Sequence, residues 1–212
     1  MHLIAEIRNA DVSRIQRVAM ACGKDPTKPA LHNLVITPYG DCDLVFSATN
    51  GVALAYVRIH VHIPHGLTKP IYFNGDAIKK LKINRSSALM CLCLDGDNYV
   101  AIVDIHGAKM TFVSTNNSSY PAWYKVIPSG DLKVPDFIFF GDDVAKLGSD
   151  VLTSDKRNPV HFASRCLTRD GRPDLLAVAH NDDITFIAMP LIVSKPNDEY
   201  IEMVSSHLLN FW

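Results

Sequence analysis

The sequence has 212 residues, enough to bury the core of one large domain or two small ones. Hydrophobic residues make up 48% and charged residues 20%, a composition that excludes a disordered or collagen-like chain. Lysine and arginine number 21 against 22 aspartate and glutamate, so the net charge of −1 excludes a global attraction to nucleic acid, and a DNA-binding surface would need local clustering.

Cysteine usage and the amino terminus indicate the compartment. The five cysteines, an odd number without the spacing of a disulfide framework, favour reduced thiols. The amino terminus carries charges in place of the apolar core of a secretory signal. No apolar run reaches the roughly 20 residues that a membrane-spanning helix needs. We therefore expect a soluble, cytoplasmic protein without disulfides.

The first predicted helix follows Asp11, a favourable N-cap residue, and ends before Gly23. Arg14, Arg17 and Lys24 lie on one face of it. The apolar residues that recur at helical spacing on another face are Val12, Ile15, Ala19 and Cys22. The helix is therefore predicted to be amphipathic, with a basic exposed side.

Most of the remaining chain shows the alternation of strands. Asn50-Gly51 marks a turn between Asp43–Thr49 and Val52–Val61, which predicts a hairpin. A three-stranded meander is predicted over Leu89–Leu94, Tyr99–Ile105 and Lys109–Ser114.

Two further helices are predicted between and after these strands. One is short, near Gly75 to Lys82, and the other runs from about Asp142 to Leu152 with little positive charge. The short helix buries Ile78 and Leu81 and exposes Lys79, Lys80 and Lys82, and the long helix has an apolar stripe of Val144, Leu147 and Val151.

The order strand, helix, several strands thus occurs three times, starting near His2, Pro70 and Pro135, as a weak internal repeat. Proline-marked linkers separate the three units. A polar stretch, Ser194–Asp198, then leads to a terminal amphipathic segment, Glu199–Trp212. That tail is predicted to form a fourth helix.

Candidate catalytic or metal-binding groups are few. His60 and His62 share one face of a strand at a spacing suited to a metal ion. The alternate residues are Val57, Ile59, Val61 and Ile63, and they form the buried face. An ordinary amphipathic strand with histidines towards solvent is therefore favoured over a metal site.

The other reactive groups have equally simple explanations. Cys91 and Cys93 stand among leucines, where core packing is the favoured interpretation. The acid pairs Asp41/Asp43 and Asp95/Asp97 would suit a cation-dependent nuclease, but they lie at strand ends and in turns, where aspartate is common. No phosphate loop, HExxH or GxSxG motif is present. We expect no enzyme, metal or cofactor, and a metal-dependent nuclease or hydrolase stays as a minor alternative.

Three segments, in order along the chain, carry a family resemblance. SATNGVALA, Ser47–Ala55, is similar to ATDGHRLA of the bacterial DNA sliding clamp, the β subunit of the replicative polymerase. SSYPAWYKVIPS, Ser118–Ser129, is similar to that family's interdomain linker GRFPDYRRVLP. ITFIAMPLIV, Ile184–Val193, is similar to its terminal strand YVVMPMRL. The resemblance covers about residues 8 to 193.

The resemblance implies an α+β sliding-clamp fold of about one and a half clamp domains, whose antiparallel sheets carry a helix in each half-domain. Residues 1–128 would form a complete clamp-like domain, 129–195 a partial second one and 196–212 the tail. A chain of this length cannot encircle DNA alone, so a ring would need a homo-oligomer of four copies, or of three if the tail acts as a further half-domain. The small size favours a mobile-element or phage protein.

The resemblance also implies two surfaces. A pocket for a partner peptide would be lined by Leu31, Thr49, Gly51, Leu54, Pro121, Val126, Ile187, Met189 and Pro190. Duplex DNA would be met, without sequence specificity, by Arg14, Arg17, Lys24, Lys79, Lys80 and Lys82, with solvated helix faces as the alternative.

The expected function is to tether a DNA polymerase or another replication factor on DNA. The alternative is a clamp mimic or adaptor that binds replication proteins without encircling DNA. Two departures from the family bear on this choice: Val52 and Ala53 replace a histidine and an arginine at the pocket, and the third helix lacks basic residues. In the tail, His207–Phe211 resembles the clamp-binding peptide QLxLF, although a structural amphipathic helix is favoured there.

Overall fold

The computed structural model describes residues 1–62, 66–83, 88–115, 120–126, 142–152, 161–169, 172–181 and 184–188. Its helices are α1 (Ala10–Ala19), α2 (Gly75–Lys79) and α3 (Asp142–Leu152), with short 3-10 helices η1 (Pro29–His32) and η2 (Trp123–Val126). Its strands are β1 (His2–Arg8), β2 (Asn33–Tyr39), β3 (Asp43–Thr49), β4 (Ala53–His60), β5 (Ile71–Asn74), β6 (Ala88–Asp95), β7 (Asn98–Ile105), β8 (Ala108–Val113), β9 (His161–Arg169), β10 (Arg172–Asn181) and β11 (Ile184–Ala188).

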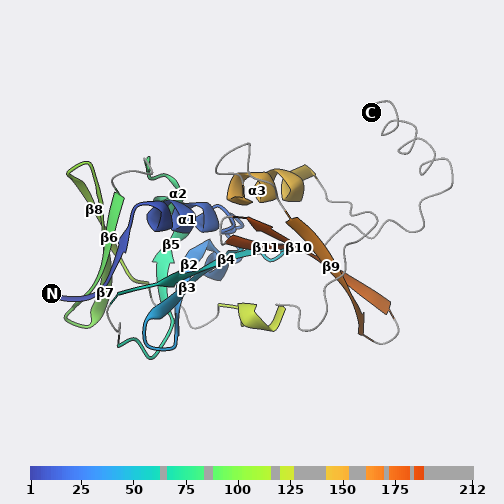
Figure 1. Cartoon of the computed structure of the whole chain (residues 1–212), viewed down its shortest axis with the longest axis horizontal. Coiled ribbons are helices and arrows are strands. Elements are labelled where there is room, and N and C mark those ends of the chain that lie inside the picture. The colour runs from blue at the N-terminus through green and yellow to red at the C-terminus, as the bar shows by residue number, and fades with distance from the viewer. Residues whose placement is uncertain are drawn as a thin grey trace.

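The strands form two antiparallel sheets. The four-stranded sheet has the order β1-β6-β7-β8, and the seven-stranded sheet has the order β5-β2-β3-β4-β11-β10-β9. Figure 1 shows α1 and α3 in a row on one side of the seven-stranded sheet, with η2 on its other side. The large sheet thus runs without interruption from the first part of the chain into the last, through the pairing of β4 with β11.

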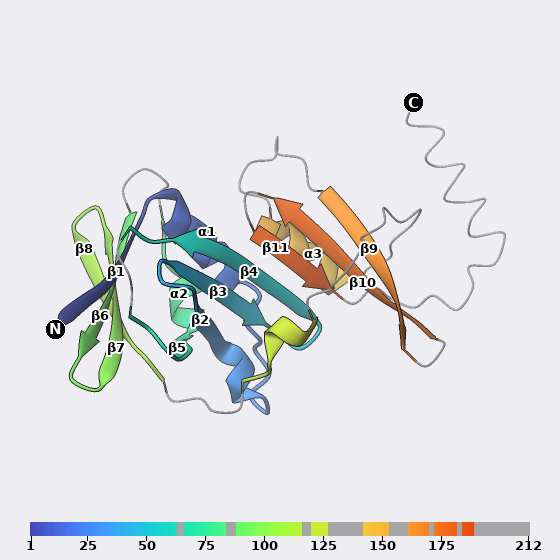
Figure 2. The ribbon, with the colours of Figure 1, turned by 60° about the horizontal axis from the view of Figure 1, so that its bottom comes forward.

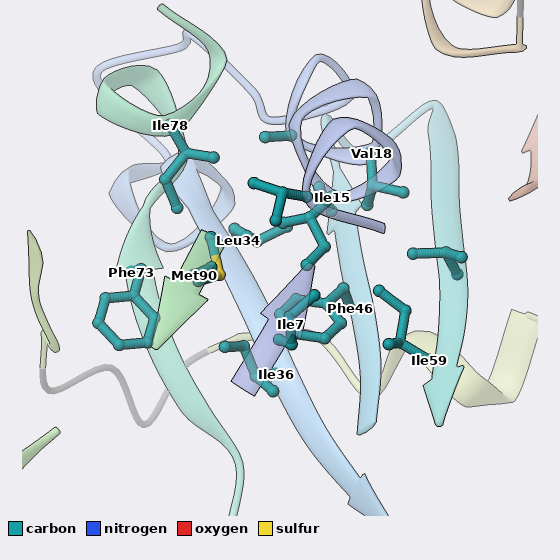
Figure 3. Close-up of a cluster of buried hydrophobic side chains, with 14 of the residues drawn as sticks. Ile7, Ile15, Val18, Leu34, Ile36, Phe46, Ile59, Phe73, Ile78 and Met90 are labelled. Carbon is teal, nitrogen blue, oxygen red and sulfur yellow. The ribbon is translucent and has the colours of Figure 1, made fainter. Parts of the chain in front are cut away.

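The core lies where α1 meets both sheets (Figure 3). Ile15 of α1, Met90 of the small sheet and Phe46 of the large sheet are all fully buried in one hydrophobic cluster. Burial of apolar side chains stabilises by roughly 25 cal/mol per Å² removed from water, so this shared cluster holds the two sheets together. Among the described residues, no helix is long and apolar enough to cross a membrane.

The predicted hairpin and meander are confirmed. The hairpin turn is closed by Asn50, whose side-chain oxygen accepts hydrogen bonds from the N–H groups of Val52 (2.9 Å) and Ala53 (2.8 Å). Gly51 has the positive φ of 93° that such a turn requires and that glycine adopts without strain. The meander is β6, β7 and β8, each within a residue or two of its predicted bounds.

The helices correct two predictions in detail. Asp11 is not the N-cap of α1: Asn9 holds that position, with φ of 50°, because its N–H bonds to the Ala88 carbonyl (2.7 Å) and turns the chain out of β1. The second helix ends at Lys79 instead of Lys82. Its first turn is capped by Asn74, whose side chain accepts from two following N–H groups. The third helix has the predicted bounds.

The structure shows which units of the internal repeat resemble each other. The unit α3-β9-β10-β11 has the connectivity of α2-β6-β7-β8, with the helix followed by three antiparallel strands. The sequences agree as well, with GDAIKKL at 75–81 and GDDVAKL at 141–147. The last unit is therefore a second copy of the second unit. The strand predicted near Pro135 lies outside the described residues.

Candidate functional site

Five of the nine residues predicted to line a pocket come together at the junction of β4 and β11. Thr49 and Leu54 are cross-strand partners in the hairpin, and Leu54 is the partner of Ile187 in the next strand. Leu31 lies against the turn, since a Cβ placed on Gly51 would stand 3.4 Å from Leu31 Cδ1. Leu31, the β3–β4 hairpin and β11 are distant in the sequence and thus meet at one place; that they line a peptide pocket stays a prediction.

Leu54 and Ile187 lie on the face of the large sheet that points away from the helices. Side chains alternate between the faces of a strand, and the neighbours Ala53 and Ala55 belong to the core under α1. Figure 2 shows η2 beside the ends of β3 and β4 on this side. The candidate pocket is therefore on the opposite side of the sheet from α1 and α3.

The other four pocket residues are placed only in part. Pro121 is exposed, and its carbonyl accepts the N–H of Trp123 (2.8 Å) at the start of η2. Val126 ends η2, and its side chain lies outside the described part of the chain, as do Met189 and Pro190. Their membership of the pocket remains a prediction.

Two aromatic residues that the sequence reasoning did not select cover this face. The Trp123 ring lies 5.7 Å from that of Tyr56 on β4, and the Tyr120 ring lies 6.0 Å from that of Tyr72 on β5. Burial raises the pKa of the Tyr120 phenol well above its usual range. Both residues belong to the quoted linker SSYPAWYKVIPS, where an aromatic pair beside proline was the available signal.

The residues that would line the candidate pocket are buried in this structure. The exposed fractions of Leu31, Thr49, Leu54 and Ile187 are 7%, 8%, 3% and 2%. The Thr49 hydroxyl donates to the Ala53 carbonyl (2.7 Å) and accepts from the Gly51 N–H (3.1 Å), so it serves the turn. A peptide anchor could reach this wall only by displacing what covers it.

The predicted DNA-facing set contains one residue that does not face solvent. Arg17 is 8% exposed, and its guanidinium donates to the carbonyls of Leu152 (3.2 Å) and Val151 (3.5 Å) at the end of α3. The interpretation of Arg17 as a DNA-facing residue is therefore wrong. Helical periodicity placed it correctly on the polar side of α1, but α3 packs against that side.

Two other members of the set are tied to acids. Arg14 is half-buried and forms an ion pair with Asp11 (2.7 Å) in the same helix. The Lys79 side chain is 13% exposed and forms an ion pair with Asp76. The hydrogen bond that Lys79 donates to Asp76 is the main cause of the lowered pKa of that carboxyl. Because an acid already neutralises each of them, Arg14 and Lys79 would attract a phosphate less than an unpaired cation would.

The exposed cations of the predicted set are Lys24, Lys80 and Lys82. Lys80 and Lys82 follow α2, and we refer to these two as the lysine cluster. Lys24 follows α1 and lies towards the start of α2, where Gly75 packs on Cys22. Lys146, on α3, is a further exposed cation that the sequence reasoning omitted. The other exposed charges of α3 are acidic, at Asp142, Asp143 and Asp150. The helix side of the molecule is therefore basic near the end of α2 and acidic along α3.

The two histidines considered as metal ligands lie at the end of β4 and just after it. His60 and His62 are exposed, as predicted, and His60 Nδ1 lies 2.8 Å from Asp43 Oδ1. Hydrogen bonds from Arg58 and then from His60 lower the pKa of the Asp43 carboxyl. Within the described ranges, no three histidine, cysteine or acidic residues are grouped so that they could hold a metal ion.

Cys93 is buried and Cys91 is half-buried. Both lie on the face of β6 opposite the core residue Met90, where they line a surface pocket of about 290 Å³. Burial raises the pKa of both thiols, which keeps them neutral and poorly nucleophilic.

Comparison with known proteins bears on the fold. No protein-family model and no curated protein sequence matches this chain. Solved structures do: a DnaN sliding clamp of Pseudomonas aeruginosa bound to griselimycin aligns with a TM-score of 0.52 and 13% identity over 94% of this chain and 67% of that one. The chain has the sliding-clamp fold. The predicted fold class is thus confirmed.

Two further sliding-clamp structures align equally well. The Helicobacter pylori β clamp bound to a DNA ligase peptide has a TM-score of 0.51 and 14% identity, over 95% of this chain and 69% of that one. The β chain of Streptococcus pneumoniae DNA polymerase III has a TM-score of 0.52 and 11% identity, over 94% and 67%. These relatives are bacterial and give no support to a mobile-element or phage origin.

Proposed function

We propose that this protein is a non-enzymatic, clamp-like replication protein that contacts duplex DNA without sequence specificity and tethers a polymerase or another replication factor. The observation that carries the proposal is the sliding-clamp fold over more than nine tenths of the chain. The helices lie on one side of the large sheet, and the pocket candidate lies on the other, which separates DNA contact from partner contact (Figure 1).

Any DNA contact would be electrostatic. Lysines bind phosphate oxygens without reading bases, and each neutralised phosphate releases counterions. The lysine cluster offers two exposed positive charges without a neighbouring exposed carboxylate in its own segment, whereas α3 sets one exposed lysine against three exposed carboxylates that would repel phosphates. DNA would therefore lie across the end of α2 and away from α3.

Neutralising Lys80 and Lys82 together is expected to weaken duplex binding and to flatten its salt dependence. Loss of two phosphate contacts lowers the slope of log K against log salt by about 1.8. The measurement is fluorescence anisotropy of a labelled duplex at several salt concentrations, with wild type and a Lys80→Gln, Lys82→Gln variant.

The matched control is Lys125→Gln, because Lys125 is also exposed but lies in η2, on the other side of the large sheet. Its binding curve should follow that of wild type. Equal salt slopes for all three proteins would remove the lysine cluster from the DNA surface.

Partner binding would use the pocket at the β4–β11 junction. The H. pylori clamp holds a DNA ligase peptide, and this chain places Leu54, Ile187 and the Tyr56–Trp123 pair together on the outer face of its sheet. An extended peptide with leucine and phenylalanine anchors fits an apolar groove of that kind. Entry of the peptide would require the covering groups to move, as the burial of Leu54 shows.

A Met189→Ala variant is expected to bind a fluorescent QLxLF peptide more weakly than wild type by about 1–2 kcal/mol, because peptide anchors concentrate binding energy in few residues. Titration of both proteins, after circular dichroism has shown that the variant is folded, measures the difference. Absence of binding by wild type, or equal affinities, would remove the pocket.

The adaptor remains a second candidate, and the charge of α3 favours it. Asp142, Asp143 and Asp150 are exposed on a helix that a DNA-encircling ring would need to be basic or neutral. An adaptor would bind the QLxLF peptide or a replication protein while the duplex assay showed no binding. The two assays above therefore separate the two functions.

A further inference from the structure

Two strands of this chain occupy equivalent positions but have different neighbours. β8 (Ala108–Val113) and β11 (Ile184–Ala188) are each the last strand of a repeated unit, and their sequences agree as MTFV at 110–113 and ITFI at 184–187. β11 lies between β10 and β4. β8 pairs with β7 and ends its sheet in the described part of the chain.

Side chains at equivalent positions of β8 and β11 differ in burial. Ile187 of β11 is 2% exposed, whereas Val113 of β8 is 54% exposed. Phe186 is 4% exposed, whereas Phe112 is only half-buried. Ile187 is thus covered where strands lie on both sides, and Val113 is uncovered where only β7 is described beside it. Phe186 is covered in addition by α3, at Gly148. An exposed apolar edge of this kind is a template for another strand.

The hairpin geometry fixes which backbone groups β8 presents. His106 and Gly107 form a two-residue turn with φ of 53° and 85°, and Ser114 N–H bonds to the Tyr99 carbonyl (2.8 Å). Even-numbered residues of β8 therefore bond to β7. The odd-numbered residues Lys109, Thr111 and Val113 direct their N–H and C=O groups outward. The odd-numbered residue Thr115, just after β8, also directs its N–H away from β7, where it bonds to the Tyr72 carbonyl (2.8 Å).

The partner strand cannot be the β4 of another copy. In this chain β4 is bonded on one edge by β3 and on the other by β11, so it has no edge to offer. A head-to-tail chain of copies that repeats the β4–β11 contact is excluded for the same reason. β8 and β1 are the two edges of the small sheet, and each has an exposed apolar side chain, Val113 at 54% and Leu3 at 42%. Val113 is the more exposed of the two, and a second β8 can pair with it in a symmetric antiparallel register.

We propose that β8 pairs with the β8 of a second copy, antiparallel, with Thr111 at the two-fold axis. Lys109 is the only charged residue of β8, and this register sets it against Val113 of the other copy and not against the second Lys109. Met110 then meets Phe112, a favourable sulfur–aromatic pair, and the two Thr111 residues form a cross-strand pair.

This arrangement preserves the orientation of the helices. An antiparallel pair of edge strands is related by a two-fold axis perpendicular to the sheet, so both copies keep α1 and α2 on the same side of the joined sheets. The result is an open arc with two lysine clusters on one side. It is a different assembly from a head-to-tail ring, and it does not depend on the proposed binding of DNA.

A pair of variants at Val113 tests the contact and its register. Val113→Lys places a lysine opposite Lys109 of the other copy, whereas Val113→Glu places a carboxylate there. Because each contact occurs twice, we expect the dimer dissociation constant to rise on the order of tenfold for Val113→Lys and to stay equal or fall for Val113→Glu. Val113 is exposed, so both variants should retain the wild-type thermal midpoint.

Sedimentation equilibrium of the full chain, from about 1 to about 200 μM, gives the association constants. Val52→Lys is the control, since Val52 is 50% exposed in the β3–β4 turn and lies outside the proposed contact. A wild type that remains monomeric throughout overturns the proposal. So does a loss of association that is equal for Val113→Lys and Val113→Glu, or absent in both.

Discussion

Replacing Gly75 by alanine is expected to destabilise the protein by about 3 kcal/mol, the upper range for overpacking a well-filled core. A Cβ at this position would stand 2.1 Å from the Sγ of Cys22, and 3.0 Å from both the Cβ of Cys22 and the carbonyl oxygen of His32. Cys22 is 3% exposed and His32 presents backbone, so neither can move aside cheaply. The close approach of α2 to the end of α1 therefore requires glycine.

Urea unfolding followed by circular dichroism measures the loss, and a double-mutant cycle assigns it. Cys22→Ala removes the sulfur that the new methyl would strike, so the two substitutions together should cost less than their sum. A Gly75→Ala variant with the wild-type midpoint would show that α2 and α1 are farther apart than the structure places them.

The elements of this fold follow closely from local sequence signals. The pair Asn50-Gly51 predicted a turn, and the structure has one there, closed by the Asn50 side chain and with a positive φ at Gly51. The helical spacing of Val144, Leu147 and Val151 predicted the bounds of α3. The start of α1 was misplaced because Asp11 and Asn9 are both good caps. The choice between them is made by the bond from Asn9 to Ala88, which is distant in sequence.

The surfaces were less predictable than the elements, because they depend on what packs across them. Nothing in the local pattern distinguishes Arg17, buried under α3, from Lys80, which is exposed. Five of the residues predicted for the pocket lie together, but the two aromatic residues beside them were not predicted. Tyr120 and Trp123 lie in a linker without periodicity, and only the fold shows that they lie over the large sheet.

The burial of Arg17 turns an expected DNA contact into an expected stabilising contact between α1 and α3. The last carbonyls of a helix have no partner within it, and a guanidinium beside them supplies donors and a favourable charge for the helix dipole. Arg17 does this for Leu152 and Val151. A hydrogen bond to a charged group contributes about 1.5–3 kcal/mol.

Arg17→Met should therefore cost about 2 kcal/mol, since the methionine keeps much of the apolar stem and removes only the donors. Hydrogen exchange should speed up in α3 more than in α1, because the contact that is lost holds the end of α3. Arg14→Met is the matched control: Arg14 pairs with Asp11 inside its own helix, a contact expected to contribute less than about 1 kcal/mol. If both variants unfold at the same urea concentration with unchanged exchange in α3, Arg17 does not join the two helices, and its place on the DNA-facing side would have to be reconsidered.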